Sequence, residues 1–483
     1  MSDIRADVVV VGSGFSGSIC AMLLKRIGCD VVLVDRRSHP RFAIGESSTP
    51  AADFVLADLA REYDLPRLLP LSQYGTMRSV YPQLNCGRKR GFSYFQHTDG
   101  HPFRQRADRS NVLLVAASSD DEVCDSHWYR PDLDSFLFEE AKTLGIAAFE
   151  NAVISVRTSS PSWQLTFQQE DSTVNIEADF LIDASGAGQF TSRHFELDNI
   201  AQQLQTNTRA AYGHFRGVKP FRELLDHEAT TVHPYQCDDA AVHHIFDNGW
   251  MWNLRFDNGI TSAGIVGSDN GAAFTRSTWD STLETFPSIG HLFESAENVL
   301  LQGLVFSNRL QRLSPQIAGT NWAMLPTTAG FIDPLHSTGI AHALIGVERL
   351  VQIIHRSRGH DAFVDELADY AKTVDAELRM IDRLVAMCYQ ALGQFDKFIS
   401  STMVYFAAVS SWEQARRRKS AHAFLLADNA DFIAVCQAVA NRLTTDISDG
   451  DFTEFARDAI EPFNSVGLFS PTSTNMYSHT AAR

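Results

Sequence analysis

The sequence lacks any long apolar run. No stretch approaches the roughly 18 consecutive apolar residues of a membrane-spanning helix. The first residues also lack the charged start, long apolar stretch and small-residue cleavage site of a secretory signal peptide. These absences predict a protein without a membrane span, located in the cytoplasm.

Positive charge is scarce as well. Lysine and arginine number 41 against 58 aspartate and glutamate residues, which gives a formal net charge of −17. Nucleic-acid binders usually carry a basic face, so this balance argues against a nucleic-acid partner. It also makes an acidic carrier protein a less favoured partner than a free small molecule, although a local basic patch could override the total.

Cysteine is infrequent and shows no motif. The seven cysteines form no C-x-x-C pair, and no Cys/His spacing matches a zinc site. They are expected to be reduced and structural. The histidine pairs His243-His244 and His97/His101 have no carboxylate at ligand spacing, so they are also expected to be structural, and no metal site is predicted.

What the chain does contain is a βαβ unit at its start. Residues 7–11 form an apolar β-branched run, which predicts a strand buried on both faces, residues 18–27 predict a helix, and residues 30–34 predict a second buried strand. A later strand, 180–182, runs into Asp183. Residues 153–156 and 163–167 alternate apolar and polar positions and predict antiparallel strands.

The last third of the chain shows helical periodicity. Apolar positions repeat at helical spacing in 363–393 and 421–443. The final segment, residues 470–483, is polar and is expected to be frayed.

A glycine motif lies between the first strand and the first helix. The segment Gly12-Ser-Gly14-Phe15-Ser16-Gly17 matches G-x-G-x-x-G, with Asp35 and Arg36 at the end of the next strand. The first glycine permits a tight turn, the second lets a pyrophosphate approach the backbone, and the third lets helix and strand pack closely. Helical N–H groups would face the phosphates, and Asp35 could accept hydrogen bonds from a ribose. This context predicts a dinucleotide site.

Two distant segments favour FAD over NAD. Asp183-Ala-Ser-Gly186 closes a later strand, and a second strand-to-helix turn occupies residues 322–339. FAD-dependent oxygenases recruit distant segments of this kind, so the choice of FAD rests on analogy with them.

Four further segments carry a family resemblance: Gly45-Glu46-Ser47, Lys89-Arg-Gly-Phe92, Trp250-Met-Trp252-Asn-Leu-Arg255, and Asp333-Pro334-Leu-His336-Ser-Thr338-Gly339. Over residues 7–350 the sequence resembles the flavin-dependent halogenases, a branch of the FAD-dependent monooxygenase superfamily, and within them the enzymes acting on phenols and pyrroles. The likeness is weak in the C-terminal helices.

The resemblance implies a role for each segment. In the family, reduced flavin, oxygen and halide give hypohalous acid, which travels through an internal tunnel to a lysine, here Lys89. The lysine delivers the halogen either as a chloramine or as a hydrogen-bonded electrophile. Arg88 and Arg90 are expected to be solvated charges. The amides of Thr338 and Gly339 would hold the halide, which suits a helix start. Alternatively, this turn serves flavin packing only, as in hydroxylases.

The remaining carried-over residues surround the flavin. Trp250 and Trp252 would form a wall between flavin and substrate, since residues i and i+2 share one strand face. The alternative is an ordinary aromatic core pair. The resemblance also makes cofactor-binding candidates of Gly45, Glu46, Ser47, Arg130, Asp183, Gly186, Asp333 and Pro334.

Three positions depart from the family pattern. Thr327 stands where many flavin enzymes have an aspartate for the ribityl chain, which predicts weak flavin retention. Arg255 replaces the proline of the W-x-W-x-I-P signature. His336 replaces the glutamate of tryptophan-directed relatives, which argues against free tryptophan as substrate. His336 would either supply acid/base chemistry near neutrality or be a spectator.

The predicted fold is α/β. A Rossmann-like FAD-binding domain of the aromatic-hydroxylase type (residues 1–65, 100–195 and 300–350) is interleaved with an antiparallel-sheet substrate domain (66–99 and 196–299). A helical C-terminal region (351–470), which we expect to cover the substrate pocket, and a tail (471–483) follow.

The predicted function is halogenation of an electron-rich aromatic ring (a phenol, a pyrrole or a fused ring) in natural-product biosynthesis. The enzyme would use FADH₂ from a separate flavin reductase, O₂, and chloride or bromide. One alternative is a single-component FAD hydroxylase using NAD(P)H. A third hypothesis, a non-enzymatic flavin-fold protein, is disfavoured because the site motifs are intact.

Overall fold

The first sheet is built around the N-terminal strand. The computed structural model describes residues 2–170, 172–269, 271, 273–420, 422–478, 480 and 481. In this sheet β1 (Ser2–Val11) pairs in parallel with both β2 (Val31–Val34) and β10 (Ser172–Asp183). The sheet is completed by β7 (Ala147–Phe149), β18 (Trp322–Met324), β9 (Trp163–Gln169) and β8 (Ser155–Thr158).

Helices cover this sheet because its strands are apolar on both faces. Helices α1 (Phe15–Arg26) and α4 (Arg130–Thr143) pack on the strands, α10 (Gly339–Ser357) packs on α1, and α2 (Pro50–Glu62) packs on α10. The parallel strands with their crossover helix confirm the predicted Rossmann-like unit. The first helix begins at Phe15, three residues before the predicted start, because it continues directly from the glycine turn.

The second sheet is largely antiparallel. Its order is β15 (Glu297–Asn298), β11 (Thr208–Arg216), β14 (Ile260–Ser268), β13 (Gly249–Arg255), β12 (Ala241–Phe246), β4 (Gly91–Gln96), β5 (Val112–Ala116) and β20 (Met476–Tyr477), with β16 (Val305–Ser307) paired to β11. Both β5 and β16 lie in stretches that the sequence placed in the FAD-binding domain. Their ladders put them in the second sheet instead.

Short elements connect the two sheets. Two small ladders join β3 (Cys86–Lys89) to β6 (Asp125–Trp128) and β17 (Arg312–Leu313) to β19 (Gly330–Phe331). The short α-helices are α3 (Tyr74–Val80), α5 (Phe190–His194), α6 (His227–Thr230), α7 (Arg276–Thr285), α8 (Pro287–Phe293) and α9 (Pro326–Ala329). The 3₁₀ turns are Leu69–Ser72, Gly186–Gly188, Ala201–Gln203, Phe221–Leu224, Phe424–Leu426 and Glu461–Phe463.

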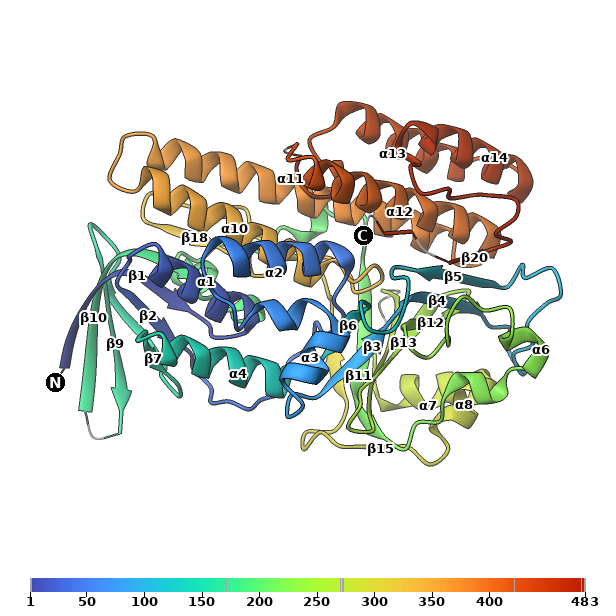
Figure 1. Ribbon diagram of the computed structural model, residues 1–483, viewed down its shortest axis with the longest axis horizontal. Helices are drawn as coiled ribbons and strands as arrows, with labels where there is room; N and C mark the ends of the chain where they lie inside the picture. Colours follow the sequence, from blue (N-terminus) through green and yellow to red (C-terminus); the bar gives the residue numbers. More distant parts are fainter. Residues whose placement is uncertain are drawn as a thin grey trace.

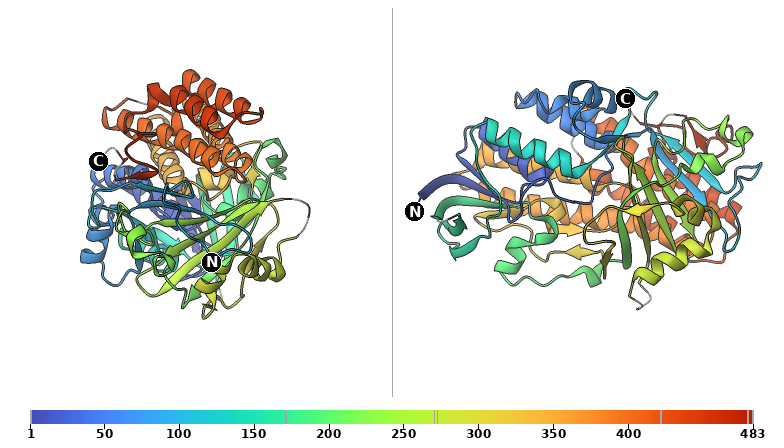
Figure 2. Two further views of the ribbon diagram at one scale, coloured as in Figure 1. Left: turned by 90° about the vertical axis from the view of Figure 1, so that its right-hand side faces the viewer. Right: turned by 90° about the horizontal axis from the view of Figure 1, so that it is seen from below.

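The C-terminal helices form a layer above both sheets (Figures 1 and 2). They are α11 (Phe363–Gln390), α12 (Phe395–Arg417), α13 (Ala430–Leu443) and α14 (Asp449–Ile460). The helical pattern predicted from residue 421 becomes an α-helix only at Ala430, and residue 421 lies outside the described residues.

The prediction of a frayed tail is wrong for Met476, Tyr477 and Thr480. Met476 and Tyr477 pair in parallel with Leu114 and Val115, and Thr480 donates to the carbonyl of Ala116. The tail thereby covers the edge of β5, whose backbone groups would otherwise lack partners. Residues 479, 482 and 483 lie outside the described residues.

In the part of the chain that the structure describes, no helix combines the length and apolar character needed to span a membrane.

Candidate active site

A large cavity opens where the carboxyl ends of β1, β2 and β10 meet, which is where open α/β sheets bind ligands. Its volume is about 1220 Å³. Distant segments contribute its walls: the glycine turn, the loop 41–47, the turn 184–188, strands β11 and β13, and the segment 327–342.

The glycine turn fits a diphosphate. Gly12 has a φ of +108°, and a Cβ there would lie 2.4 Å from the carbonyl oxygen of Ala184. A Cβ on Gly17 would lie 1.9 Å from the carbonyl oxygen of Gly12, so α1 can pack this closely only with glycine there. A Cβ on Gly14 would meet only the side chains of Arg130 and Asp134, at 3.4 Å or more, which leaves the front of the turn open. Gly12, Gly14, Phe15 and Ser16 line the cavity.

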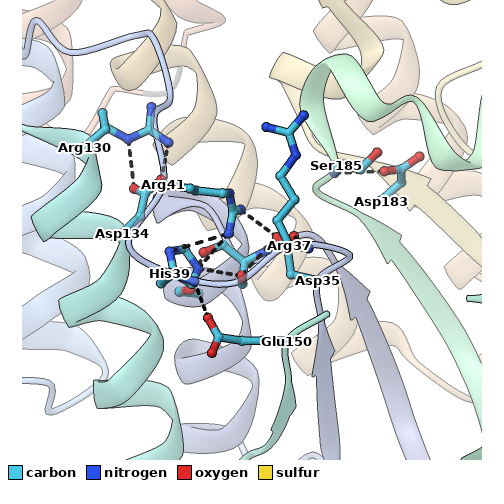
Figure 3. Close-up of polar contacts among 11 residues, drawn as sticks. Asp35, Arg37, His39, Arg41, Arg130, Asp134, Glu150, Asp183 and Ser185 are labelled. Carbon is cyan, nitrogen blue, oxygen red and sulfur yellow. Dashed lines mark hydrogen bonds and ion pairs between the residues drawn. The ribbon is translucent and has the colours of Figure 1, made fainter. Parts of the chain in front are cut away.

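Asp35 lies at the end of β2 and lines the cavity, as predicted (Figure 3). Its Oδ2 accepts hydrogen bonds from the amide and the hydroxyl of Ser13 and forms a 2.7 Å ion pair with Arg41. Its Oδ1 accepts from the amide of Arg37. A ribose would therefore meet a carboxylate that is already oriented by the turn, and Arg41 as well as Arg36 line the same wall.

Arg130 is the first residue of α4 and orients a neighbouring loop. Its guanidinium forms two hydrogen bonds with Asp134 and donates to the carbonyls of Ile44 and Gly45 (Figure 3). The sequence made Arg130 a candidate cofactor contact, and Arg130 does line the cavity. In this structure its guanidinium holds the loop 44–47 against α4.

Asp183 takes a different role from the one the sequence suggested. Its Oδ1 accepts from the amide of Ser185, and its Oδ2 accepts from the amide and hydroxyl of Thr191. The side chain is fully buried and is not part of the cavity wall. Asp183 therefore shapes the turn that presents Ser185 and Gly186 to the cavity.

The loop 45–47 supplies a buried carboxylate. Gly45, Glu46 and Ser47 line the cavity, and Glu46 Oε1 lies 2.7 Å from His214 Nε2. Among the described residues, Glu46 Oε2 and Ser47 Oγ have no hydrogen-bond partner. Buried polar atoms are usually paired, so these two atoms fit a site that receives polar groups from a cofactor.

The predicted halide turn lies at the start of α10. Ser337 has a φ of +52°, and Asp333, Pro334, Thr338 and Gly339 line the cavity. The first amides of a helix have no intrahelical acceptor and lie at its positive end. Apart from its chain neighbours and the backbone of its own helix, no atom lies within 4 Å of where a Cβ on Gly339 would be, so the space beside this residue is open.

The predicted tryptophan wall lies on one face of β13. Trp250, Trp252 and Leu254 line the cavity, and the two indole centroids are 6.0 Å apart. Arg255 points to the opposite face, where it donates to the carbonyl of Val218. Its departure from the family proline therefore leaves the cavity surface unchanged.

A hydrogen-bond chain joins this wall to the halide turn. Trp250 Nε1 donates to Tyr389 Oη at 2.8 Å, and Tyr389 donates to Asp333 Oδ2 at 2.9 Å. Thr208 also donates to Asp333 Oδ2. Burial raises the pKa of Asp333 to about 7 despite these donors. Tyr389 belongs to α11, so a C-terminal helix fixes the wall and the turn relative to each other.

Lys89 ends β3 and lies outside the residues lining this cavity. Its side chain is fully buried, and Nζ donates to the carbonyl of Ser48 at 2.6 Å and lies 4.1 Å from the ring centroid of Phe92. Directly across the β3–β6 ladder is Asp125, which is also fully buried. This places a carboxylate within side-chain reach of the lysine.

The neighbouring arginines differ from Lys89. Arg88 is partly exposed and pairs with Asp121 and Asp239, in keeping with the predicted surface charge. Arg90 contradicts that prediction, because it is buried and bonds to Ser118 and Asp121.

His336 is buried in an apolar setting. Its ring stacks on Tyr405 with centroids 4.1 Å apart, and Nε2 lies 3.5 Å from Cys388 Sγ. Burial lowers the pKa of His336 to about 3. The ring is therefore neutral at physiological pH, which removes the basis for the acid/base role near neutrality that the sequence suggested.

The other histidines are in protein contacts. His97 Nε2 lies 3.0 Å from His244 Nδ1, inside the hydrophobic core that packs on the second sheet. His101 is exposed, and its Nδ1 contacts the carbonyl of Asp99. His243 has Nδ1 2.9 Å from the carbonyl of Ala241 and Nε2 3.1 Å from that of Leu335, and its one N–H donates to either of them. It also lines the cavity, which the sequence did not predict. Across the described residues, no cluster of three or more potential metal ligands occurs.

The cavity is basic although the chain is acidic. Its lining includes seven arginines and four carboxylates. This local excess of positive charge suits the diphosphate of FAD, which the glycine turn also fits. The cavity residues that the sequence did not reveal are Arg37, Arg41, Phe42, Arg193, Tyr212, His243, Arg309 and Arg312. They carry no motif, because each is brought to the cavity by tertiary packing.

Comparison with known proteins agrees with this geometry. A family model described as "Tryptophan halogenase" matches residues 127–398, and one described as "NAD(P)-binding Rossmann-like domain" matches residues 10–62. Both matches confirm the resemblance and the fold inferred from the sequence.

Individual relatives point the same way. The chain is 27% identical to monodechloroaminopyrrolnitrin halogenase PrnC of Pseudomonas fluorescens over 402 residues. The aligned region covers 80% of this chain and 68% of that protein. It is 26% identical to tetracycline 7-halogenase of Kitasatospora aureofaciens over 85% of this chain and 72% of that protein. The solved structure of halogenase PltM in complex with phloroglucinol and FAD superposes with a TM-score of 0.85 at 23% identity and covers 99% of both chains.

The packing at Gly17 predicts a steric effect on cofactor binding. Substitution Gly17→Ala should push α1 away from the turn, destabilise the protein by about 1–3 kcal/mol and weaken FAD binding at least about tenfold. Gly450→Ala, on an exposed helical position with no atom near its Cβ, is the matched control and should leave both unchanged. FAD titration and thermal melting measure the two effects. Unchanged FAD affinity in Gly17→Ala would contradict the assignment of this turn.

The raised pKa of Asp333 predicts a pH dependence of stability. Between about pH 4 and pH 7 the folded state keeps the proton that the unfolded state releases, so the free energy of unfolding falls as pH rises through this window. Asp333→Asn cannot ionise, so its stability relative to wild type should rise from pH 4 to pH 7 and then level off. Denaturant unfolding across this pH range is the measurement, with exposed Asp369→Asn as control. A flat difference would show that Asp333 is already ionised below pH 5.

Proposed function

The chain belongs to the tryptophan halogenase family of flavin-dependent halogenases, and from that premise we propose that it halogenates a small hydroxylated or pyrrole-type aromatic ring through Lys89. The observation that carries the proposal is the position of Lys89. It is fully buried, beside Phe92, but outside the residues that line the cavity that fits FAD. This separation suits a diffusible oxidant that leaves the flavin and reacts elsewhere.

The cofactor is FAD, which in its reduced form supplies the two electrons that convert O₂, halide and a proton into hypohalous acid and water. The ring then forms a carbon–halogen bond while the oxygen–halogen bond breaks. The ring proton leaves, and the departing oxygen becomes water. The protein residues have to hold halide, exclude the substrate from the flavin and orient the electrophile.

Each of these tasks has candidate residues. The glycine turn, Asp35, Arg36 and the loop 45–47 would hold FAD, with Gly186, Asp333 and Pro334 at the opposite wall. The amides of Thr338 and Gly339 would bind chloride or bromide at the positive end of α10. Trp250 and Trp252 would keep the substrate away from the flavin, held in place by the bond from Trp250 to Tyr389.

Lys89 would orient hypohalous acid by donating a hydrogen bond from Nζ. The same atom donates to the Ser48 carbonyl, and Asp125 across the ladder offers a counter-charge. Because both groups are hydrogen-bond acceptors, they favour a lysine that acts as a hydrogen-bond donor. They therefore support delivery as a hydrogen-bonded electrophile over delivery as a chloramine.

The substrate class follows from the site and the relatives. His336 leaves no carboxylate at the position where tryptophan-directed relatives have glutamate, which argues against free tryptophan. The solved relative with phloroglucinol supports a phenol. A homologue named for a pyrrole on a peptidyl-carrier protein keeps a pyrrole as the alternative ring. The net charge of −17 favours a free ring over a carrier-bound one.

The hydroxylase alternative is not favoured. It was kept open by Arg255, and that side chain lies on the opposite face of β13 from the cavity. We therefore propose that reduced FAD comes from a separate flavin reductase. Thr327 stands in place of an aspartate that would bind the ribityl chain, and the weak flavin retention that this predicts also suits an exchangeable cofactor. We further propose that the first sheet with its helices binds FAD and that the second sheet and the C-terminal helices enclose the substrate.

The proposal is tested with a panel of phenols, pyrroles and indoles. The full-length protein is incubated with flavin reductase, FAD, NADH, oxygen and bromide, and the products are examined by mass spectrometry. A product heavier by one bromine, with its isotope doublet, is expected. A product heavier by one oxygen, formed without the reductase, would instead establish a hydroxylase.

The role of Lys89 gives a second test. Substitutions Lys89→Ala and Lys89→Met should lower the halogenation rate by at least about a thousandfold while flavin reoxidation continues, because the electrophile forms but is not delivered. Lys142→Met, on an exposed face of α4, is the control for loss of a lysine. Bromide incorporation and flavin absorbance are followed together. Halogenation at the wild-type rate in Lys89→Ala would refute the assignment.

A further inference from the structure

A row of rings crosses the second sheet from the tryptophan wall towards Lys89. His243 lies 5.0 Å from Trp250 and 4.5 Å from Tyr94, measured between ring centroids. Tyr94 lies 6.2 Å from Phe92, over which Lys89 Nζ is placed. The row runs over β13, β12 and β4, which are neighbours in the sheet. His243 also lies 6.0 Å from Phe92 directly, so Tyr94 and Phe92 lie side by side on β4, both in contact with His243.

Helix α12 covers this row. Phe398 contacts Tyr94 with centroids 5.7 Å apart, and Phe406 contacts Phe92 at 5.6 Å. In Figure 1 the orange-red α12 lies directly above β4 and β12. The C-terminal helices and the second sheet thus enclose the rings in an aromatic box, here defined as Phe92, Tyr94, Phe398 and Phe406.

The hydroxyl of Tyr94 has no partner in this box. The residue is 0% exposed, and Oη makes no hydrogen bond to any described residue. Burial, with smaller contributions from Tyr405 and Cys388, raises the pKa of Tyr94 well above its ordinary value. The hydroxyl therefore stays protonated and can both donate and accept. An unpaired buried hydroxyl is destabilising, so its presence points to a ligand.

Two more unpartnered polar atoms lie close by. His336 Nδ1 and Ser401 Oγ are buried and have no hydrogen-bond partner among the described residues. His336 contacts Cys388, whose Sγ lies 3.7 Å from Thr402 Oγ1, next to Ser401 on α12. Ser401 is three residues after Phe398, so both lie on the same side of the helix. The three unpartnered atoms, Tyr94 Oη, His336 Nδ1 and Ser401 Oγ, all belong to neutral hydrogen-bonding groups.

We propose that the aromatic box is the substrate chamber and that the Tyr94 hydroxyl binds a phenolic hydroxyl of the ring to be halogenated. This inference rests on the proposed function and narrows its substrate to hydroxylated rings. A phenol can donate to one buried group and accept from another, whereas a pyrrole N–H can only donate. The ring itself would pack against Phe92, Phe398 and Phe406, close to Lys89 Nζ.

The test compares Tyr94→Phe with Tyr235→Phe. Tyr235 is also a buried tyrosine, but its hydroxyl donates to the carbonyl of Phe92. Thermal melting of the free proteins should show no loss of stability in Tyr94→Phe and a lower Tm in Tyr235→Phe, because only the second loses a hydrogen bond. A lower Tm in Tyr94→Phe, equal to that of Tyr235→Phe, would overturn the inference.

Substrate discrimination is measured with 1,3-dihydroxybenzene and pyrrole in the reconstituted holoenzyme. Tyr94→Phe should raise KM for dihydroxybenzene about tenfold, the effect of one lost hydrogen bond, and change KM for pyrrole less than about twofold. Equal changes for both rings, or no change for either, would overturn the inference.

Ring binding without turnover keeps this test separate from the proposed function. Dihydroxybenzene should raise the Tm of the wild-type holoenzyme and raise it less in Tyr94→Phe, even if no ring is halogenated. If the ring raises the Tm in this way but is not halogenated, the proposed function is refuted and the chamber assignment stands. An equal Tm increase in both proteins would refute the chamber assignment.

Discussion

The close packing of α1 against the end of β1 is the constraint on which the rest of the site depends. Gly12 and Gly17 bring helix and strand so near that an added Cβ at Gly17 would lie 1.9 Å from a carbonyl oxygen. This contact holds the start of α1 at the cavity, which Gly14, Phe15 and Ser16 line. The remaining cavity walls are then supplied by segments that have to reach this point, including the loop 45–47 held by Arg130.

A second constraint acts across the two sheets. Tyr389 of α11 accepts a hydrogen bond from Trp250 of β13 and donates one to Asp333 beside the halide turn. A single buried phenol therefore ties together a C-terminal helix, the wall and the turn. This explains physically why the C-terminal region takes part in the site although its own sequence carries no recognisable motif.

Charge is arranged locally against the global trend. Arginines dominate the lining of the cofactor cavity, while the chain as a whole carries −17. On the far side of the wall the groups are mostly neutral aromatic rings and unpartnered hydrogen-bonding atoms, with Lys89 at the edge. The basic cavity thus suits an anionic cofactor, whereas the aromatic surroundings of Phe92 and Tyr94 suit an uncharged group.

The sequence by itself determined the βαβ unit, the glycine turn, the wall strand and the family, because these depend on local spacing and on motifs read within a few residues. It assigned Asp183 to the cofactor, expected a solvated Arg90 and a frayed tail, and gave no sign of Tyr389 or Tyr94. Tertiary structure decided these points. The partner of a carboxylate, guanidinium or hydroxyl can lie far away in the chain, as Arg130 shows with the carbonyl of Gly45 and Tyr389 with Trp250. Burial, which sets the protonation of His336 and leaves the Tyr94 hydroxyl unpaired, exists only once the helices have closed over the sheet.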